Sequence, residues 1–89
     1  MQTVSSTRTP SDARRAISGP QCRAARGLLG WTLDDLATRS EVTRITINKF
    51  ENGKTLPYAD TIAALRACFE AEGIQFTSEP GREGVSRRV

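Results

Sequence analysis

The residues best equipped for chemistry lie on one face of a helix predicted at residues 43–52. They bring a guanidinium, a hydroxyl, an amide and an ammonium group together with one aliphatic side chain, in the series Arg44, Ile45, Thr46, Asn48 and Lys49. Most of these groups donate hydrogen bonds, and two of them are cationic. Ile47 and Phe50 are expected to point inward from the other face. The pattern suits a helix that is held by a core and presented to a polar partner.

Catalytic chemistry finds no support in the residue types. The chain has no His, which removes the commonest general base, and no glycine-rich phosphate loop. Asp34 and Asp35 are adjacent and point about 100° apart on a helix, so they cannot form a carboxylate dyad. With two Cys and no His, a Cys/His zinc site is excluded. We therefore expect no enzyme, no metal and no cofactor.

Two short amphipathic helices joined by a turn are predicted within residues 32–55. The first follows Thr32, where Thr-x-x-Asp forms a near capping box, and the joint is residues 39–42. The second follows Thr43, a good N-cap, and stops at Asn52 and the glycine after it. Its β-branched start also has strand propensity, but the flanking caps favour helix. This is the pattern of a helix-turn-helix, which presents its second helix to the major groove of DNA.

The remaining elements should support those two helices. A Ser-x-x-Gln capping box at Ser18 begins a helix that Gly30 ends, and a fourth helix is predicted near residues 59–72 with Gly73 as its C-cap. Its apolar stripe is Ile62, Leu65 and Phe69. A hairpin is predicted from residues 74–77 and 85–89, with Pro80, Gly81 and Gly84 in the break between them.

Length and charge set the class of the protein. Eighty-nine residues make one domain, and the net charge is +3, with +4 in residues 1–54 and −1 in residues 55–89. A basic excess around the helix-turn-helix is the footprint expected for a phosphate backbone. No apolar run approaches a membrane span and the N-terminus lacks a signal-peptide core, so we expect a cytoplasmic protein. Cys22 and Cys68 are interpreted as small core residues in a reducing compartment.

Three segments are expected. Residues 1–17 form a flexible basic arm with a helical turn at 12–17, and its arginines either follow DNA phosphates or belong to a solvated tail (Arg8, Arg14 and Arg15). Residues 18–73 form the DNA-binding domain. Residues 74–89 form a strand-like extension and a candidate dimerisation element. An isolated hairpin is marginal in water, so it must pack on the first and fourth helices or pair with another chain.

One resemblance becomes specific at residues 43–55. The run Thr-x-x-Thr-Ile-x-x-Phe-Glu-Asn-Gly-Lys-Thr resembles the phage-repressor-like (XRE) helix-turn-helix family. The preceding Leu-Asp-Asp-Leu-Ala is similar to that family's Gln-x-Glu-Leu-Ala, and Arg26 with Leu29 and Gly30 matches its first helix. The resemblance covers residues 21–69 and indicates a short single-domain member. It implies a mainly α, four-to-five-helix repressor-like fold with a C-terminal β-hairpin.

The resemblance also implies roles for individual residues. The second helix crosses the DNA backbone and the third lies in the major groove, with base-reading side chains at Arg44, Ile45, Thr46 and Lys49. The positions that match phosphate contacts are Thr32, Thr43, Asn52 and Lys54. Arg26 and Glu51 match a partly buried ion pair that fixes the recognition helix to the scaffold.

Two departures from the family pattern affect the expected docking. Glu41 stands where the family usually has Gly in the turn. Either it adopts a positive φ, at a cost on the order of 1 kcal/mol, or the turn has a different shape. Leu33 stands where a Gln commonly contacts phosphate, so that contact is lost or becomes apolar.

The expected function is a sequence-specific DNA-binding transcriptional regulator. We expect a homodimeric repressor on a palindromic operator, in the bacterial cytosol or nucleoid. Its partner is double-stranded DNA, with no membrane and no small-molecule ligand. The alternative is a protein-interaction module on the same scaffold, such as an antitoxin or an anti-activator. The exposed basic face argues against this alternative, because protein-binding patches favour aromatic anchors.

Overall fold

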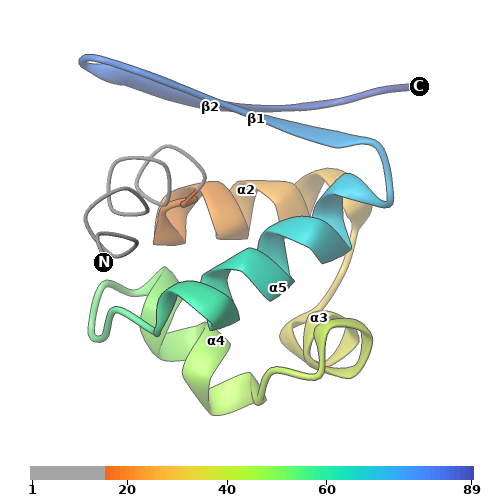
Figure 1. Cartoon of the computed structure of the whole chain (residues 1–89). Coiled ribbons are helices and arrows are strands. Elements are labelled where there is room, and N and C mark those ends of the chain that lie inside the picture. The colour runs from red at the N-terminus through yellow and green to blue at the C-terminus, as the bar shows by residue number, and fades with distance from the viewer. Residues whose placement is uncertain (1–15) are drawn as a thin grey trace, which may run out of the picture.

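A computed structural model describes residues 16–89, in which helices form a layer covered on one side by a hairpin (Figure 1). The order is α2 (Gly19–Leu29), α3 (Leu33–Ser40), α4 (Arg44–Glu51), α5 (Ala59–Glu70), β1 (Ile74–Glu79) and β2 (Arg82–Arg87). The expected mainly helical fold with a C-terminal hairpin is confirmed. The arm expected at residues 1–17 lies outside the described residues except for its end, where Ile17 is buried in the core. None of the described helices is long and apolar enough to cross a membrane.

Local caps start the first two helices where the sequence predicts. Ser18 accepts the Gln21 N–H at 3.2 Å, while the Gln21 side chain accepts the Ser18 N–H at 3.0 Å. Thr32 and Asp35 make the same reciprocal pair at 3.0 and 2.9 Å. Each box satisfies two of the N–H groups that a helix start leaves unpaired. Gly30 ends α2 in the left-handed region at φ 68°.

The turn between α3 and α4 is shorter than the four residues predicted. Residues 39 and 40 are helical, because the Glu41 N–H still donates to the Ala37 carbonyl at 2.9 Å. Glu41 then adopts the left-handed conformation with φ 62° and ψ 24°. Of the two alternatives for this position, the structure has the one with positive φ. The turn thus has the left-handed conformation that a glycine adopts easily, at a backbone cost of about 1 kcal/mol for a residue with a Cβ.

The β-branched segment at residues 44–47 is helical, as the caps predicted. Thr43 accepts the Thr46 N–H at 3.3 Å, and the chain leaves α4 through Gly53 at φ 72°. The predicted end of α5 was wrong by two residues. Ala71 is the C-cap, and Gly73 lies in the tight turn that reverses the chain into β1, with φ 89°.

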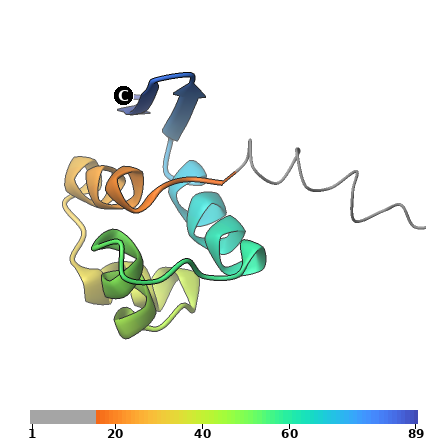
Figure 2. The ribbon, with the colours of Figure 1, turned by 90° about the vertical axis from the view of Figure 1, so that its left-hand side faces the viewer.

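The hairpin is longer and tighter than predicted. Its strands pair antiparallel from Ile74 opposite Arg87 to Glu79 opposite Arg82, so only residues 80 and 81 form the turn. Gly84, which the sequence placed in the break, lies in β2, where an added Cβ would meet the Thr77 hydroxyl at 2.8 Å. The hairpin lies over α2 and α5, as the turned view shows (Figure 2).

Hydrogen bonds and an aromatic contact attach the hairpin to the helices. The buried amide of Gln21 donates to the carbonyls of Thr77 and Gly84, each at 3.0 Å. The ring of Phe76 meets Phe69 edge-on, with centroids 5.9 Å apart. Of the two ways expected to stabilise the hairpin, packing on the first and fourth helices is the one that the structure has.

The core lies between the helices and the hairpin, and it holds α4 in place. Its buried hydrophobic members come from the four helices, from β1 and from residue 17: Ile17, Cys22, Ala25, Leu36, Ile47, Phe50, Ile62, Leu65, Phe69 and Ile74. Ile47 and Phe50 are the inward residues of α4, as the spacing predicts. Where α2 meets α4, the backbone of Gly19 approaches the Phe50 carbonyl so closely that no side chain fits between them.

Candidate nucleic-acid interface

One face of α4 is open to solvent and carries the four residues expected to read bases. Arg44, Ile45 and Lys49 are exposed, and Thr46 is half-buried. Ile45 leaves 68% of its surface in water, which is unusual for an isoleucine and indicates that the core does not need it. The opposite face is buried, so α4 is fixed from behind while its outer side chains have no role in the packing.

Arg44 has a partner that the sequence analysis missed. Its Nε atom lies 3.2 Å from Oδ1 of Asp34 in the first turn of α3. Both side chains are exposed, with 63% and 79% of their surfaces in water. No local spacing signals this pair, because the two residues belong to different helices and meet only when the turn closes.

The two threonines expected at phosphates are both N-caps. The hydroxyl of Thr32 is occupied by the Asp35 N–H, and the Thr32 N–H is occupied by the Asp35 carboxylate. The hydrogen bond from the Thr32 backbone, and then one from the Thr32 side chain, lower the pKa of the Asp35 carboxyl below its usual range. At Thr43 the hydroxyl donates to the Thr46 hydroxyl at 2.9 Å. The N-terminus of each helix faces solvent beside these caps.

Asn52 and Lys54, the other expected phosphate residues, lie at the far end of α4. The Asn52 amide donates to the Asn48 carbonyl at 2.9 Å and accepts from Arg23 at 2.8 Å. Lys54 is exposed. Arg23 therefore joins this end of the face, although the sequence analysis gave it no role. It comes from α2, and only tertiary packing brings it to Asn52.

Arg26 and Glu51 lie in contact behind α4. The guanidinium donates to both carboxylate oxygens, from Nη2 at 2.6 Å and from Nε at 2.8 Å. The Cys22 thiol donates to the same carboxylate at 3.2 Å, and the Glu51 side chain is only 1% exposed. Arg26 also donates to the Trp31 carbonyl at 3.1 Å, which ties the end of α2 to the start of α3.

These contacts set the ionisation of the buried groups. Burial by itself would raise the pKa of Glu51, but the hydrogen bonds from Arg26 and Cys22 outweigh it and the net shift is downward. The hydrogen bonding of Arg26 to the Glu51 carboxylate raises the pKa of Arg26. Burial, followed by the Glu51 charge, raises the pKa of the Cys22 thiol far above its usual range. Glu51 and Arg26 are thus charged, and Cys22 is a neutral donor.

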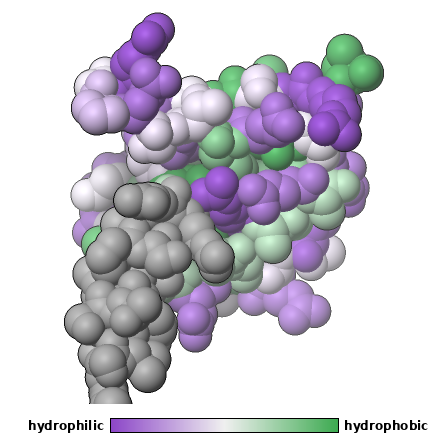
Figure 3. Space-filling view, turned by 45° about the horizontal axis from the view of Figure 1, so that its top comes forward, coloured by the Kyte–Doolittle hydropathy of each residue, from purple (hydrophilic) through white to green (hydrophobic). Residues whose placement is uncertain are grey.

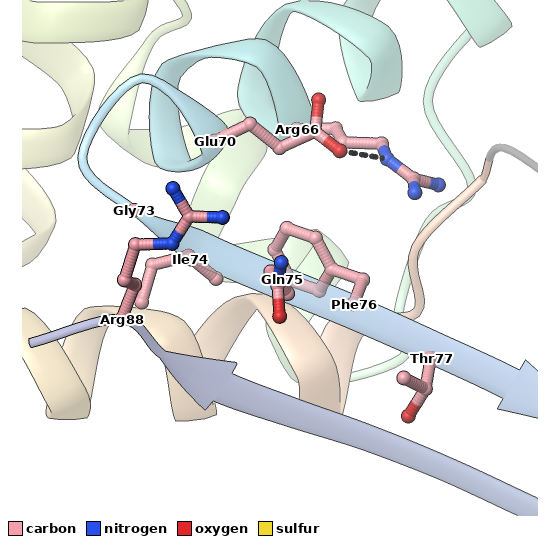
Figure 4. A pocket seen from close by; sticks show the side chains of 8 residues that line it. All are labelled: Arg66, Glu70, Gly73, Ile74, Gln75, Phe76, Thr77 and Arg88. Carbon is pink, nitrogen blue, oxygen red and sulfur yellow. Dashed lines mark hydrogen bonds and ion pairs between the residues drawn. The ribbon is translucent and has the colours of Figure 1, made fainter.

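Two grooves border the hairpin on the other side of the molecule. The groove beside β1 is lined by Arg66, Glu70 and Phe76, and Arg88 stands at its opposite wall (Figure 4). The Arg66 guanidinium donates to Glu70 at 2.8 Å and lies over the Phe76 ring. The groove between α2 and β2 is lined mainly by small and apolar residues: Pro20, Gln21, Ala24, Gly27, Leu28, Glu83, Gly84 and Val85. Neither groove pairs a nucleophile with a base.

No group of three or more potential metal ligands occurs among residues 16–89. The exposed face that the rest of the fold holds in a fixed position is that of α4, with α3 packed behind its start and α2 behind its end. Two helices joined by a tight left-handed turn, with the second held by a core and open on its outer side, define a helix-turn-helix domain.

The comparison with protein families agrees with this class. A family model described as helix-turn-helix matches residues 23–70, more than half of the chain. The chain belongs to this XRE-type helix-turn-helix family, a family of DNA-binding regulators. A search of curated proteins finds no match.

Proposed function

We propose that this protein is a sequence-specific transcriptional regulator that binds double-stranded DNA with α4 in the major groove. The observation that carries the proposal is the division of α4 into two faces. Ile47, Phe50 and Glu51 are buried, whereas Arg44, Ile45 and Lys49 extend into water. A helix held so firmly from behind can present side chains to a groove about 12 Å wide without losing its shape.

The chemistry of the outer face fits base edges. Arg44 can donate two parallel hydrogen bonds to O6 and N7 of guanine. Ile45 and the methyl group of Thr46 can pack on thymine methyl groups, and Lys49 can reach a guanine or a phosphate. Ile45 and Lys49 point in nearly the same direction, with Arg44 and Thr46 at the two flanks of that face, so the four side chains can contact neighbouring bases.

Phosphate contacts are assigned to the rim of this face. Thr32 and Thr43 lie at helix starts, where the dipole and unpaired N–H groups favour an anion. Asn52 and Lys54 lie at the far end, and Arg23 adds a third group there. Because the Asn52 amide is engaged by Asn48 and Arg23, its contact with a phosphate would exchange one of these partners.

We further propose that the protein is a cytoplasmic repressor that binds a palindromic operator as a homodimer, with residues 74–89 as the dimerisation element. The hairpin supports this because both of its outer edges carry backbone groups without a third strand, and such edges favour pairing with another chain. Apolar surface also shows between the strands and the helices beneath them (Figure 3). The hairpin lies on the side opposite α3 and α4, so a dimer contact there leaves α4 accessible (Figure 1).

One observation favours the alternative, a protein-interaction module. Leu56 and Tyr58 follow the helix-turn-helix and leave 83% and 87% of their surfaces in water. Tyrosine is a typical anchor of a protein interface, and the leucine two residues earlier adds exposed apolar surface. They lie beyond α4, so they are compatible with DNA binding as well.

The test is a selection from random DNA followed by titration of the selected duplex. We expect specific binding by the full chain, and Arg44→Ala should weaken it by about 1–3 kcal/mol because a bidentate base contact is lost. Arg66→Ala on α5 is the matched control, since it removes the same charge away from α4 and from residues 74–89, and it should leave the base preference unchanged.

An absence of binding at low salt would overturn the proposal and favour the protein-interaction alternative. Equal losses for Arg44→Ala and Arg66→Ala would also contradict it, because the binding would then depend on net charge and not on α4.

A further inference from the structure

Asp34 occupies an unexpected place for an acidic residue in a DNA-binding face. It lies in the first turn of α3, and its Oδ1 atom is 3.2 Å from Nε of Arg44, the first residue of α4. The N-terminal residues of a recognition helix are the ones that reach base edges. The pair therefore stands at the place where base contacts begin.

Asp34 contacts one side of the Arg44 guanidinium, and the N–H groups on its other side remain available for DNA. Arginine has five N–H donors in a rigid planar fork. The carboxylate lies at Nε, whereas a bidentate contact with guanine can use the two terminal nitrogens. A carboxylate behind the fork and a guanine in front of it can be bound together, since they share no hydrogen.

The pair contributes little to folding, because both side chains are largely exposed and water screens their attraction. Its effect is on the freedom of Arg44. An unrestrained arginine can swing to any nearby phosphate, and it loses that freedom when it docks on a base. A fixed carboxylate limits the swing before DNA arrives, and it also repels phosphates from the same position.

The neighbouring Asp35 differs in role. It is taken up by the capping box with Thr32, so it helps to start α3. Asp34 makes no such cap and points instead to the start of the next helix. The two adjacent carboxylates thus have different roles.

We infer that Asp34 is a positioning residue that holds Arg44 for end-on recognition of one guanine and so determines specificity at that base. The inference rests on the proposed function, because it assumes that α4 enters the major groove. It adds a residue outside the recognition helix to the specificity of that helix.

A double-mutant cycle tests it with the full chain. Wild type, Asp34→Ala, Arg44→Ala and the double variant are titrated with the selected duplex and with a duplex in which the assigned guanine is replaced. Asp34→Ala should reduce the ratio of the two dissociation constants about tenfold, most of the discrimination of a bidentate contact. In the Arg44→Ala background it should change the ratio no further. Binding to unrelated DNA should not weaken.

Glu70→Ala is the matched control. Glu70 and Arg66 form another acid–arginine pair, at 2.8 Å on α5, away from α4 and outside residues 74–89. This variant removes the same charge and should keep the wild-type ratio. Arg44→Lys should weaken the guanine preference even with Asp34 present, because an ammonium group has no planar fork that Asp34 can hold from behind while its front faces guanine.

Different results would overturn different statements. A wild-type ratio in Asp34→Ala, or an equal loss of affinity for every sequence, would overturn the role of Asp34 while leaving DNA binding in place. Sharper discrimination in Asp34→Ala would mean that the carboxylate restrains Arg44 from the base, which also contradicts the inference. Failure of wild type to select any DNA sequence would overturn the proposed function and this inference together.

Discussion

At the scale of single residues, Glu51 shows how charge holds the recognition helix. Its carboxylate is buried and accepts hydrogen bonds from Arg26 and Cys22, with Arg23 also within 3.6 Å. Burying an ion is costly unless its lone pairs are matched, and here they are. The arrangement explains why Cys22 is more than a small core residue, because its thiol is one of the donors.

We predict that Glu51→Gln destabilises the protein by about 3–5 kcal/mol at pH 7, because it leaves the half-buried Arg26 without its counter-charge. The folded state lowers the pKa of Glu51. The stabilisation is therefore complete above the usual glutamate pKa of about 4.3 and is lost as the pH falls through the lower folded value. Thermal unfolding from pH 7 to pH 3 measures both effects, and the gap between wild type and variant should narrow on acidification.

Glu70→Gln is the control, because Glu70 makes an exposed pair with Arg66 four residues earlier on α5. Its effect should stay within about 0.5 kcal/mol at every pH. A Glu51→Gln protein that melts like wild type at pH 7 would show that the ion pair does not lock α4.

At the scale of elements, α2 supports both α4 and the hairpin. Its first turn approaches α4 through Gly19, its Gln21 amide donates to both strands, and its Arg26 reaches Glu51. One helix therefore connects the recognition helix to the C-terminal hairpin. The close approach of Gly19 to the Phe50 carbonyl sets how near α2 and α4 can lie.

We predict that Gly19→Ala destabilises the protein by about 1–3 kcal/mol, because the added methyl group meets the α4 backbone and must push the helices apart. Gly27→Ala, later in the same helix, has open space at the new Cβ and should stabilise the protein by about 0.5–1 kcal/mol. Chemical denaturation of the two variants measures the contrast. Equal effects would mean that the approach of α2 to α4 is not tight.

At the scale of the whole molecule, the two faces have separate tasks. The hairpin covers one side of α2 and α5, and α3 and α4 lie on the other side (Figures 1 and 2). Truncation after Gly73 is a poor test of dimerisation, because it also removes Ile74 and Phe76 from the core and its border. Assembly is better measured on the full chain.

We predict that the selected DNA is an inverted repeat with half-sites about 10 base pairs apart, and that it binds two copies of the chain. Sedimentation of complexes with one or two half-sites gives the stoichiometry. Affinity should also fall steeply with salt, because each neutralised phosphate contributes a slope of about −0.9 in log K against log salt concentration.

A duplex with a single half-site is the control, and it should bind more weakly and with one copy only. A selected site without two-fold symmetry, bound by one copy, would refute the dimer.

Local signals in the sequence predicted most of the fold. The capping boxes at Ser18 and Thr32 and the N-cap at Thr43 gave helix starts that the structure confirms. These signals work because each cap depends on residues three positions apart. The errors fall where distant parts meet: the length of the turn before α4, the end of α5, and Gly84, whose place in β2 depends on pairing with Thr77.

The sequence by itself determined the two faces of α4, because helical spacing separates Ile47 and Phe50 from Ile45 and Lys49 whatever surrounds them. Only the tertiary structure decided which groups stand beside that face. Asp34 at Arg44, Arg23 at Asn52 and Cys22 at Glu51 meet across different elements. Such contacts depend on how helices pack in space, and no periodicity along the chain encodes them.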